Sequence, residues 1–267
     1  MTASFLMLTA ATLVAWPGPG DRAGLDLKVV ELRGDASKGR LVNCSPGARP
    51  CDFPDPARPT VVFIHGSNPT PQAVRFPMAE RLGEALARRP GAPALNVLGW
   101  NWNGDTVVSL HVRANHENAV QQGRLLAATL RARGLVPGRT HLVGQSAGAI
   151  VAASAARILF TQTGQQVGQV TLLDPATNYH ALVFERLAVG SCARLTEHFW
   201  APGPTGFSRP VAFAGVRDQR VDVPGAWRGM IDPFRSAHIN TVRWYITTAA
   251  NPSYPGGFNT SFCVGAW

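Results

Sequence analysis

Cysteine and lysine are both scarce in this chain of 267 residues. Neither a Cys-x-x-Cys pair nor a His/Cys cluster occurs, so the ligand spacing of a zinc site is absent. Lys28 and Lys38 are the two lysines, and arginine supplies the other basic residues behind a net charge of +9. The arginines are spread along the chain and form no basic stripe with interleaved aromatics. We therefore expect no metal, no cofactor and no nucleic-acid partner, and either a solvated basic surface or attraction to an anionic lipid surface.

A long apolar run is also missing. Residues 1–16 are mostly apolar and end at Pro17-Gly18-Pro19-Gly20, but this run is too short to span a bilayer, so we expect no transmembrane segment. An apolar run with such an ending is typical of a secretory signal peptide, although no Lys or Arg precedes it. Residues 1–20 are therefore assigned to a signal peptide or apolar N-terminal segment of a secreted protein. The alternatives are a mis-assigned start or a cytoplasmic protein.

The four cysteines also favour a secreted protein if they form disulfide bonds. Cys44, Cys51, Cys192 and Cys263 allow three pairings. A bond between Cys44 and Cys51 would close a small loop rich in proline and glycine, which leaves Cys192 and Cys263 as the second pair. We expect disulfide bonds in this arrangement.

Strand and helix patterns alternate along the chain, which contains no repeats or low-complexity tracts. Strands are predicted at residues 25–33 and 40–43 (an antiparallel edge hairpin), 61–64, 94–100, 140–143, 170–173 and 211–216, and helices at 71–89, 115–133, 147–160 and 239–248. The length and this alternation predict a single α/β domain over residues 21–267, with a doubly wound, mostly parallel sheet. In such a sheet, ligands bind beyond the carboxyl ends of the strands.

A Gly-Gln-Ser-Ala-Gly run, from Gly144 to Gly148, lies where the apolar strand at 140–143 gives way to an alanine-rich helix. This is the context of a nucleophile elbow, in which a serine occupies a strained turn. Gly144 and Gly148 fill the two places where the strand and the helix must pass closely. We therefore predict that Ser146 is a nucleophile rather than a structural turn residue.

A nucleophilic serine needs a histidine to take its proton and an acid to orient that histidine. His238 precedes the predicted helix at 239–248, so we expect it in a loop whose helix anchors it, and His198 and His180 are the alternatives. Position alone leaves the acid open. Asp174 ends the strand after the elbow helix, whereas Asp218 and Asp222 follow a later strand, where many hydrolases of this fold place theirs.

These motifs, in this order, resemble the catalytic domain of the pancreatic-lipase-like family of α/β-hydrolases. The matching pieces are Val62-Phe63-Ile64-His65-Gly66, Gly99-Trp100-Asn101-Trp102, His141 to Ala149, Leu173-Asp174-Pro175-Ala176, Gly206-Phe207-Ser208-Arg209-Pro210 and Ser236-Ala237-His238. The resemblance implies an α/β-hydrolase fold and a triad of Ser146, Asp174 and His238. It favours Asp174 as the acid because the family places its acid in a Leu-Asp-Pro-Ala context.

Several positions depart from the family pattern. Gln145 and Ala147 stand where the family usually has His and Leu, and Asn101 stands where it has Asp or a similar residue. About a dozen residues separate Gly225 from His238, which leaves little room for the family's lid segment. We also expect no counterpart of the accessory β-sandwich of the vertebrate lipases within residues 21–267. These departures bear on substrate choice rather than on the elbow.

The oxyanion of ester hydrolysis needs two donors, for which we expect the backbone N–H groups of Ala147 and Ser67. Four aromatic residues are candidates for an acyl pocket, with a place in the core as the alternative: Trp100, Trp102, Phe76 and Phe207. The expected function is a serine ester hydrolase of the lipase or carboxylesterase type, acting on a small-molecule or lipid ester. An acyltransferase, a thioesterase or a non-catalytic lipid-binding relative is the alternative.

Overall fold

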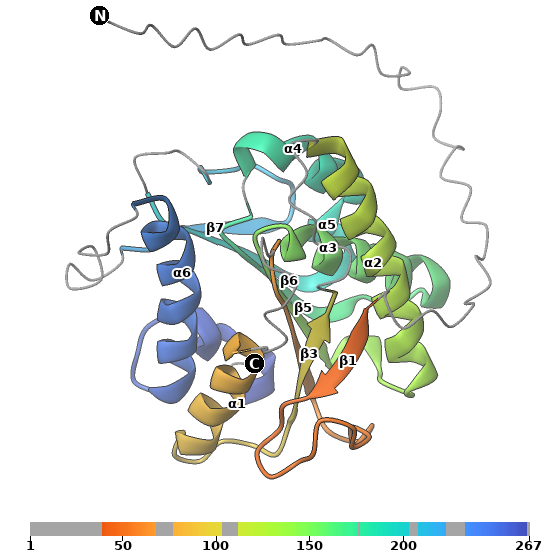
Figure 1. Cartoon of the computed structure of the whole chain (residues 1–267), viewed down its shortest axis with the longest axis vertical. Helices are drawn as coiled ribbons and strands as arrows, with labels where there is room; N and C mark the ends of the chain where they lie inside the picture. The colour runs from red at the N-terminus through yellow and green to blue at the C-terminus, as the bar shows by residue number, and fades with distance from the viewer. Residues whose placement is uncertain are drawn as a thin grey trace, which may run out of the picture. The chain divides into compact units, whose positions relative to one another are not determined.

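A seven-stranded sheet lies at the centre of the described part of the chain (Figure 1). The computed structural model describes residues 39–67, 77–102, 112–175, 177–202, 208–222 and 233–265, which all fall within one unit, Ala36–Trp267. The predicted N-terminal segment at 1–20 and the predicted strand at 25–33 lie outside the described residues.

The strands run in the order β1-β3-β2-β4-β5-β6-β7 across the sheet. They are β1 (Arg40–Asn43), β2 (Thr60–Ile64), β3 (Asn96–Asn101), β4 (Thr140–Gln145), β5 (Val167–Leu173), β6 (Ala193–Trp200) and β7 (Val216–Arg220). Only the β1–β3 pair among these described strands is antiparallel, and every other neighbouring pair is parallel. The mostly parallel, doubly wound sheet predicted from the sequence is therefore confirmed.

Apolar strands lie at the middle of the sheet because they are covered on both faces. Every residue of β2 and of β5 is buried, as expected of parallel strands covered on both faces, although β5 includes the polar residues Gln169 and Thr171. Successive side chains of β2 point to opposite faces, so that Val62 and Ile64 join one core cluster while Val61 and Phe63 join the other.

Helices cover both faces (Figure 1). They are α1 (Pro77–Arg88), α2 (Val112–Ala132), α3 (Gly148–Thr163), α4 (Thr177–Leu187), α5 (Val189–Cys192) and α6 (Pro233–Ala250), with short 3-10 turns η2 (Pro137–Arg139), η4 (Gly257–Thr260) and η5 (Phe262–Val264). Helices α2 and α3 pack on the face of Val62 and Ile64, and α1 and α6 pack on the face of Val61 and Phe63. The order of strands and the placement of helices are those of the α/β-hydrolase fold.

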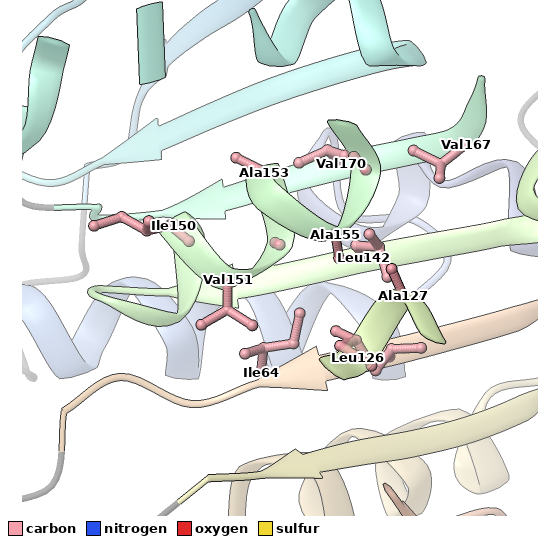
Figure 2. Packing of buried hydrophobic residues seen from close by; sticks show 14 of the residues in the cluster. Ile64, Leu126, Ala127, Leu142, Ile150, Val151, Ala153, Ala155, Val167 and Val170 are labelled. Atoms are coloured by element: carbon pink, nitrogen blue, oxygen red, sulfur yellow. The ribbon is translucent and has the colours of Figure 1, made fainter. Parts of the chain in front are cut away.

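The elbow helix α3 is buried along most of its length (Figure 2). Its small residues, among them Ala153 and Ala155, let the helix lie close to the sheet, while Val151 lies near Ile64 of β2. The helix ends at Gly164, whose φ of 69° is left-handed and therefore suits glycine. This packing fixes the position of Ser146, which lies two residues before the helix.

The structure differs from the predicted elements in three places. The strand predicted at 211–216 is instead β7, Val216–Arg220, an edge strand with little apolar sequence that periodicity does not reveal. No helix or strand is predicted between residues 173 and 211, but the structure has α4, α5 and β6 there. The helix predicted at 239–248 begins earlier, as α6.

The expected disulfides are wrong, because all four cysteines are free thiols in the structure. Cys192 lies in the core cluster that contains α3, and Cys263 lies in the cluster on the opposite face, so the sheet separates the two sulfur atoms. Cys44 packs against the α1 side of the sheet, whereas Cys51 is exposed. Burial raises the pKa of Cys44 to about 11 and that of Cys263 to about 12, which keeps both thiols protonated.

Among the described helices, none combines the length and the hydropathy needed to cross a membrane.

Candidate active site

Ser146 occupies a strained turn between β4 and α3. Its φ of 54° lies in the left-handed region, which a residue with a β-carbon adopts at a cost. The backbone N–H of Ser146 donates to the carbonyl of Leu173 at 3.0 Å, which ties the turn to the end of β5. The residue is 8 % exposed, so the hydroxyl lies at the edge of solvent.

The glycines around this turn are there because no β-carbon fits. A β-carbon on Gly144 would fall 2.5 Å from Cα of Ala149, and one on Gly148 would fall 2.5 Å from the carbonyl oxygen of Ile64. Strand and helix therefore pass as closely as a nucleophile elbow requires. The same holds for Gly66, where a β-carbon would fall 2.7 Å from Cβ of Ser146.

The loop after β2 brings a second backbone segment to the serine. Gly66 packs directly on the turn, and Ser67 follows it at the surface. Ala147 opens α3 on the other side of Ser146. Within the described part of the chain, neither Ser67 N–H nor Ala147 N–H donates to a protein acceptor. Both predicted oxyanion donors thus flank the turn, and their role stays a prediction.

His238 and Asp174 form a short hydrogen bond, with 2.6 Å between Nδ1 and Oδ2. Asp174 follows β5 with a φ of 45° and is 1 % exposed, and its backbone N–H donates to the carbonyl of Phe199. Its other oxygen, Oδ1, is buried without a hydrogen-bond partner among the described residues. The structure therefore pairs the histidine and the acid that the family resemblance implies, 64 residues apart in the chain.

The expected loop position of His238 is wrong. The residue lies inside α6, which begins at Pro233, and its side chain keeps 17 % of its surface exposed. The sequence before His238 contains Pro233 at the first helical position, where proline is common because its missing N–H is unpaired there anyway. Reading the apolar spacing alone placed the helix start too late.

His65 supports the loop rather than the chemistry. Its Nδ1 lies 2.6 Å from the carbonyl oxygen of Gly66, and its Nε2 accepts from the backbone N–H of Trp102 at 3.3 Å. Burial lowers the pKa of His65 to about 4, so the ring is neutral near neutral pH and has the single proton that this pairing needs.

The two tryptophans lie in the core. Trp100 and Trp102 are 1 % and 2 % exposed. The indole N–H of Trp100 donates to Gln122 at 3.1 Å, and that of Trp102 donates to the carbonyl of His65 at 2.8 Å. Their burial corrects the pocket assignment, since a side chain without exposed surface cannot contact an acyl chain. Phe76 and Phe207 lie outside the described residues.

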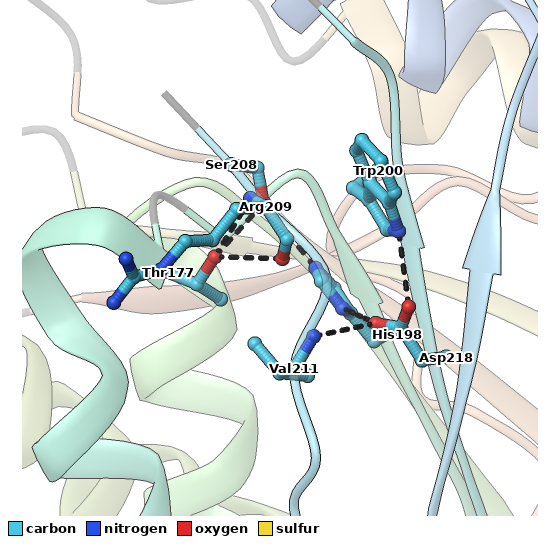
Figure 3. Close-up of polar contacts among 7 residues, drawn as sticks. All are labelled: Thr177, His198, Trp200, Ser208, Arg209, Val211 and Asp218. Atoms are coloured by element: carbon cyan, nitrogen blue, oxygen red, sulfur yellow. Dashed lines mark hydrogen bonds and ion pairs between the residues drawn. The ribbon is translucent and has the colours of Figure 1, made fainter. Parts of the chain in front are cut away.

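A second array of serine, histidine and aspartate is formed by Ser208, His198 and Asp218 (Figure 3). His198 Nδ1 lies 2.6 Å from Oδ1 of Asp218, and its Nε2 lies 3.3 Å from Oγ of Ser208. Asp218 also accepts from the backbone N–H of Val211 and from the indole of Trp200, both at 3.1 Å. This network joins β6 and β7 to the segment that follows Ser208.

Because Ser208 and His198 are buried away from solvent, we assign this second array a structural rather than a catalytic role. The His198 side chain is 0 % exposed, and Ser208 is 5 % exposed. Burial lowers the pKa of His198, although Asp218 and Asp174 oppose that shift. Asp218 therefore belongs to His198 rather than to His238, and exposed Asp222 pairs with Arg220. The side chain of His180 lies outside the described residues.

Gln145 contacts both sides of the site, and the sequence did not reveal this role. Its Oε1 accepts from the backbone N–H of Gly66 at 3.0 Å, and its Nε2 lies 2.8 Å from Nε2 of His238. The departure from the family's His at this position was the one signal in the sequence.

Among the described residues, no group of three or more His, Cys, Asp or Glu side chains is arranged to hold a metal ion.

The chain adopts an α/β-hydrolase fold and resembles the pancreatic-lipase-like family. It is 24 % identical over 200 residues to pancreatic triacylglycerol lipase of Myocastor coypus, a match that covers 63 % of this chain and 41 % of the lipase. The chain thus spans less than half the length of that relative. No family model matches the sequence.

Several solved structures with some similarity are named as esterases or serine hydrolases. An esterase of Pyrobaculum calidifontis is 15 % identical with a TM-score of 0.39, over 80 % of this chain and 84 % of the esterase. An IroE-like serine hydrolase of Shewanella oneidensis is 15 % identical with a TM-score of 0.41, over 73 % of this chain and 74 % of the hydrolase. These similarities are weak, and the strand order and the elbow carry the fold assignment.

Proposed function

We propose that this protein is a serine ester hydrolase of the lipase or carboxylesterase type that uses Ser146, His238 and Asp174. One observation carries the proposal. At the carboxyl ends of β4 and β5, a strained serine lies beside a buried carboxylate that is hydrogen-bonded to a partly exposed histidine. The resemblance to a triacylglycerol lipase supports the same chemistry.

In the proposed acylation step, the hydroxyl of Ser146 attacks the ester carbonyl while Nε2 of His238 takes its proton. Asp174 stabilises the resulting imidazolium through the Nδ1 hydrogen bond. The oxyanion receives hydrogen bonds from the N–H groups of Ala147 and Ser67, and losing one donor of this kind costs on the order of 3 kcal/mol. The intermediate expels the alcohol, which takes the proton from His238, and leaves an acyl-serine.

In deacylation, water replaces the alcohol. His238 takes a proton from the water as its oxygen attacks the acyl carbonyl, and the collapsing intermediate returns Ser146 to its hydroxyl form with the same proton. The products are one carboxylic acid and one alcohol for each ester and water consumed.

Covalent labelling and a substrate panel test the proposal. A fluorophosphonate should label one serine, Ser146, and p-nitrophenyl esters from acetyl to palmitoyl should release p-nitrophenol. Triglyceride and phospholipid emulsions in the same panel identify the preferred lipid class. A folded protein that neither reacts with the fluorophosphonate nor hydrolyses any ester in the panel would contradict the proposal.

Replacing His238 should abolish turnover, whereas replacing His198 should mainly reduce stability. His238→Ala removes the general base, so we expect a loss similar to that of Ser146→Ala. His198→Ala removes the donor to Oδ1 of Asp218 and the contact of the ring with Ser208 in the interior, which we expect to lower the free energy of unfolding by roughly 2 kcal/mol. Ester turnover and urea unfolding measured on both variants check this. The reverse pattern would move the base to His198.

Hydrolysis should not require a lipid interface. The segment before His238 is short for a mobile lid, and residues 177–200 are built into the fold as α4, α5 and β6. Rates on soluble short-chain esters should therefore rise smoothly with concentration. The measurement is the initial rate across the solubility limit of the substrate. An abrupt rise on emulsion formation would show that a segment of this chain covers the site in water.

A further inference from the structure

Gln145 links the proposed base to the loop that carries the proposed oxyanion donor. It is the last residue of β4, directly before Ser146, and its side chain is partly buried. The amide spans residues that are far apart in the chain, since Gly66 lies 79 positions before it and His238 lies 93 positions after it. Ser67, whose N–H is the expected donor, follows Gly66 directly.

The contacts leave one orientation for the Gln145 amide. The backbone N–H of Gly66 can only donate, so the group that faces it must be the carbonyl oxygen, Oε1. The NH₂ group then faces His238 and can only donate to Nε2. An amide turned the other way would place two donors against each other at Gly66.

This orientation determines the tautomer of His238. Because Gln145 donates to Nε2, that nitrogen carries a lone pair, and the ring proton is on Nδ1, where it bonds to Oδ2 of Asp174. A base that takes a proton from Ser146 at Nε2 needs this same tautomer. Gln145 and Asp174 thus hold the ring from its two nitrogens.

We propose that Gln145 is a positioning residue that fixes the tautomer and the ring plane of His238 before substrate binds. The inference rests on the proposed function. When an ester enters, the Ser146 hydroxyl replaces the Gln145 amide as the donor to Nε2, and the amide keeps its bond to Gly66. Gln145 therefore fixes the position of His238 relative to the loop at Gly66 and Ser67.

Gln145→Glu separates this role from simple support of the loop. A glutamate has the same length and can still accept from Gly66, but its carboxylate accepts rather than donates at His238. It therefore favours a proton on Nε2, the nitrogen that must be free. If Gln145 only supported the loop, the glutamate would be as good as the glutamine.

The primary readout is the protonation of His238, measured by ¹⁵N NMR on the free protein at pH 7. The wild-type signal should show a proton on Nδ1 and none on Nε2, and Gln145→Glu should show a proton on Nε2. Comparison with a His238→Gln sample assigns the signal. This measurement needs no substrate, so its result does not depend on whether the protein is an esterase. Fluorophosphonate labelling of the wild-type protein tests the proposed esterase function separately.

Kinetics give the second readout. Gln145→Glu should lower kcat by about tenfold or more with little change in KM, because the base starts in the wrong form. The matched control is Gln166→Glu, which also replaces a donating amide by a carboxylate. Gln166 lies at the opposite end of β5 from Asp174, and its side chain donates to the carbonyl of Ser191. The control should match wild type.

Two results would overturn the proposal. One is a Gln145→Glu protein with wild-type kcat and a wild-type ¹⁵N pattern. The other is Gln145→Met with wild-type kcat, because this variant keeps the Asp174 bond at Nδ1 and loses only the donor that holds the ring plane at Nε2. The Met variant also keeps the test open if the Glu variant fails to fold.

Discussion

Ser146→Ala should abolish ester hydrolysis while the protein stays folded. The substitution removes the proposed nucleophile, and removal of such a serine costs roughly 10⁶-fold in kcat in a serine hydrolase. The fold should tolerate it, because the hydroxyl lies at the edge of solvent and accepts or donates no hydrogen bond in the described part of the chain. Alanine keeps the β-carbon, so the left-handed turn has the same backbone cost.

The measurement is turnover of a p-nitrophenyl ester beside a thermal unfolding curve, with Ser154→Ala as the matched control. Ser154→Ala is the same substitution within α3, at a position where the hydroxyl is buried and donates to the carbonyl of Val120. We expect that control to lose about 1 kcal/mol of stability and to keep its turnover. Wild-type turnover by folded Ser146→Ala would remove Ser146 from the mechanism.

The central sheet could be predicted from the sequence because its strands are apolar on both faces. The strands at 61–64 and 140–143 were placed almost at their observed bounds, and the strand at 170–173 was right but short, since β5 begins at Val167. The edge strand β7 was missed because exposed Arg217 and half-buried Asp218 and Gln219 give no apolar alternation. Periodicity thus reports burial, and it fails where a strand is held mainly by its backbone.

The disulfides failed for a different reason. Spacing along the chain suggested two pairs, but pairing depends on distance in space, and the sheet lies between Cys192 and Cys263. The sequence has no signal for which face of a sheet a cysteine will occupy when its segment is a short helix or a 3-10 turn.

The part of the candidate site that could be predicted is the turn at Ser146, because its sequence motif requires a particular backbone geometry. The glycines at 144 and 148 require close passage whatever the rest of the chain does, and the structure places them so. His238 came from the family resemblance and from its place before an apolar helix face. The Gln145 contacts could not be predicted, because they join three segments whose meeting depends on the whole fold.

Replacing the proposed acid by its amide should lower turnover by roughly 10⁴-fold without unfolding the protein. In Asp174→Asn, the carboxylate that can only accept at Nδ1 is replaced by an amide that can also donate there, so the ring is no longer held from Nδ1 in the tautomer that leaves Nε2 free, and only Gln145 still favours that tautomer. The amide also has no negative charge to stabilise the imidazolium. Since Asp174 is 1 % exposed and almost isosteric with asparagine, packing should survive.

Asp218→Asn and Asp222→Asn are the controls, because both residues were candidates for the acid. Asp218 holds His198 at 2.6 Å, so its amide variant should lose stability and much less turnover, and exposed Asp222, which pairs with Arg220, should lose little of either. The measurement is kcat/KM for the three variants, with urea unfolding of each. A loss for Asp218→Asn that exceeds the loss for Asp174→Asn would move the acid to β7. Such a result would also mean that His238 rather than His198 is the structural histidine, since each carboxylate is hydrogen-bonded to one of the two rings.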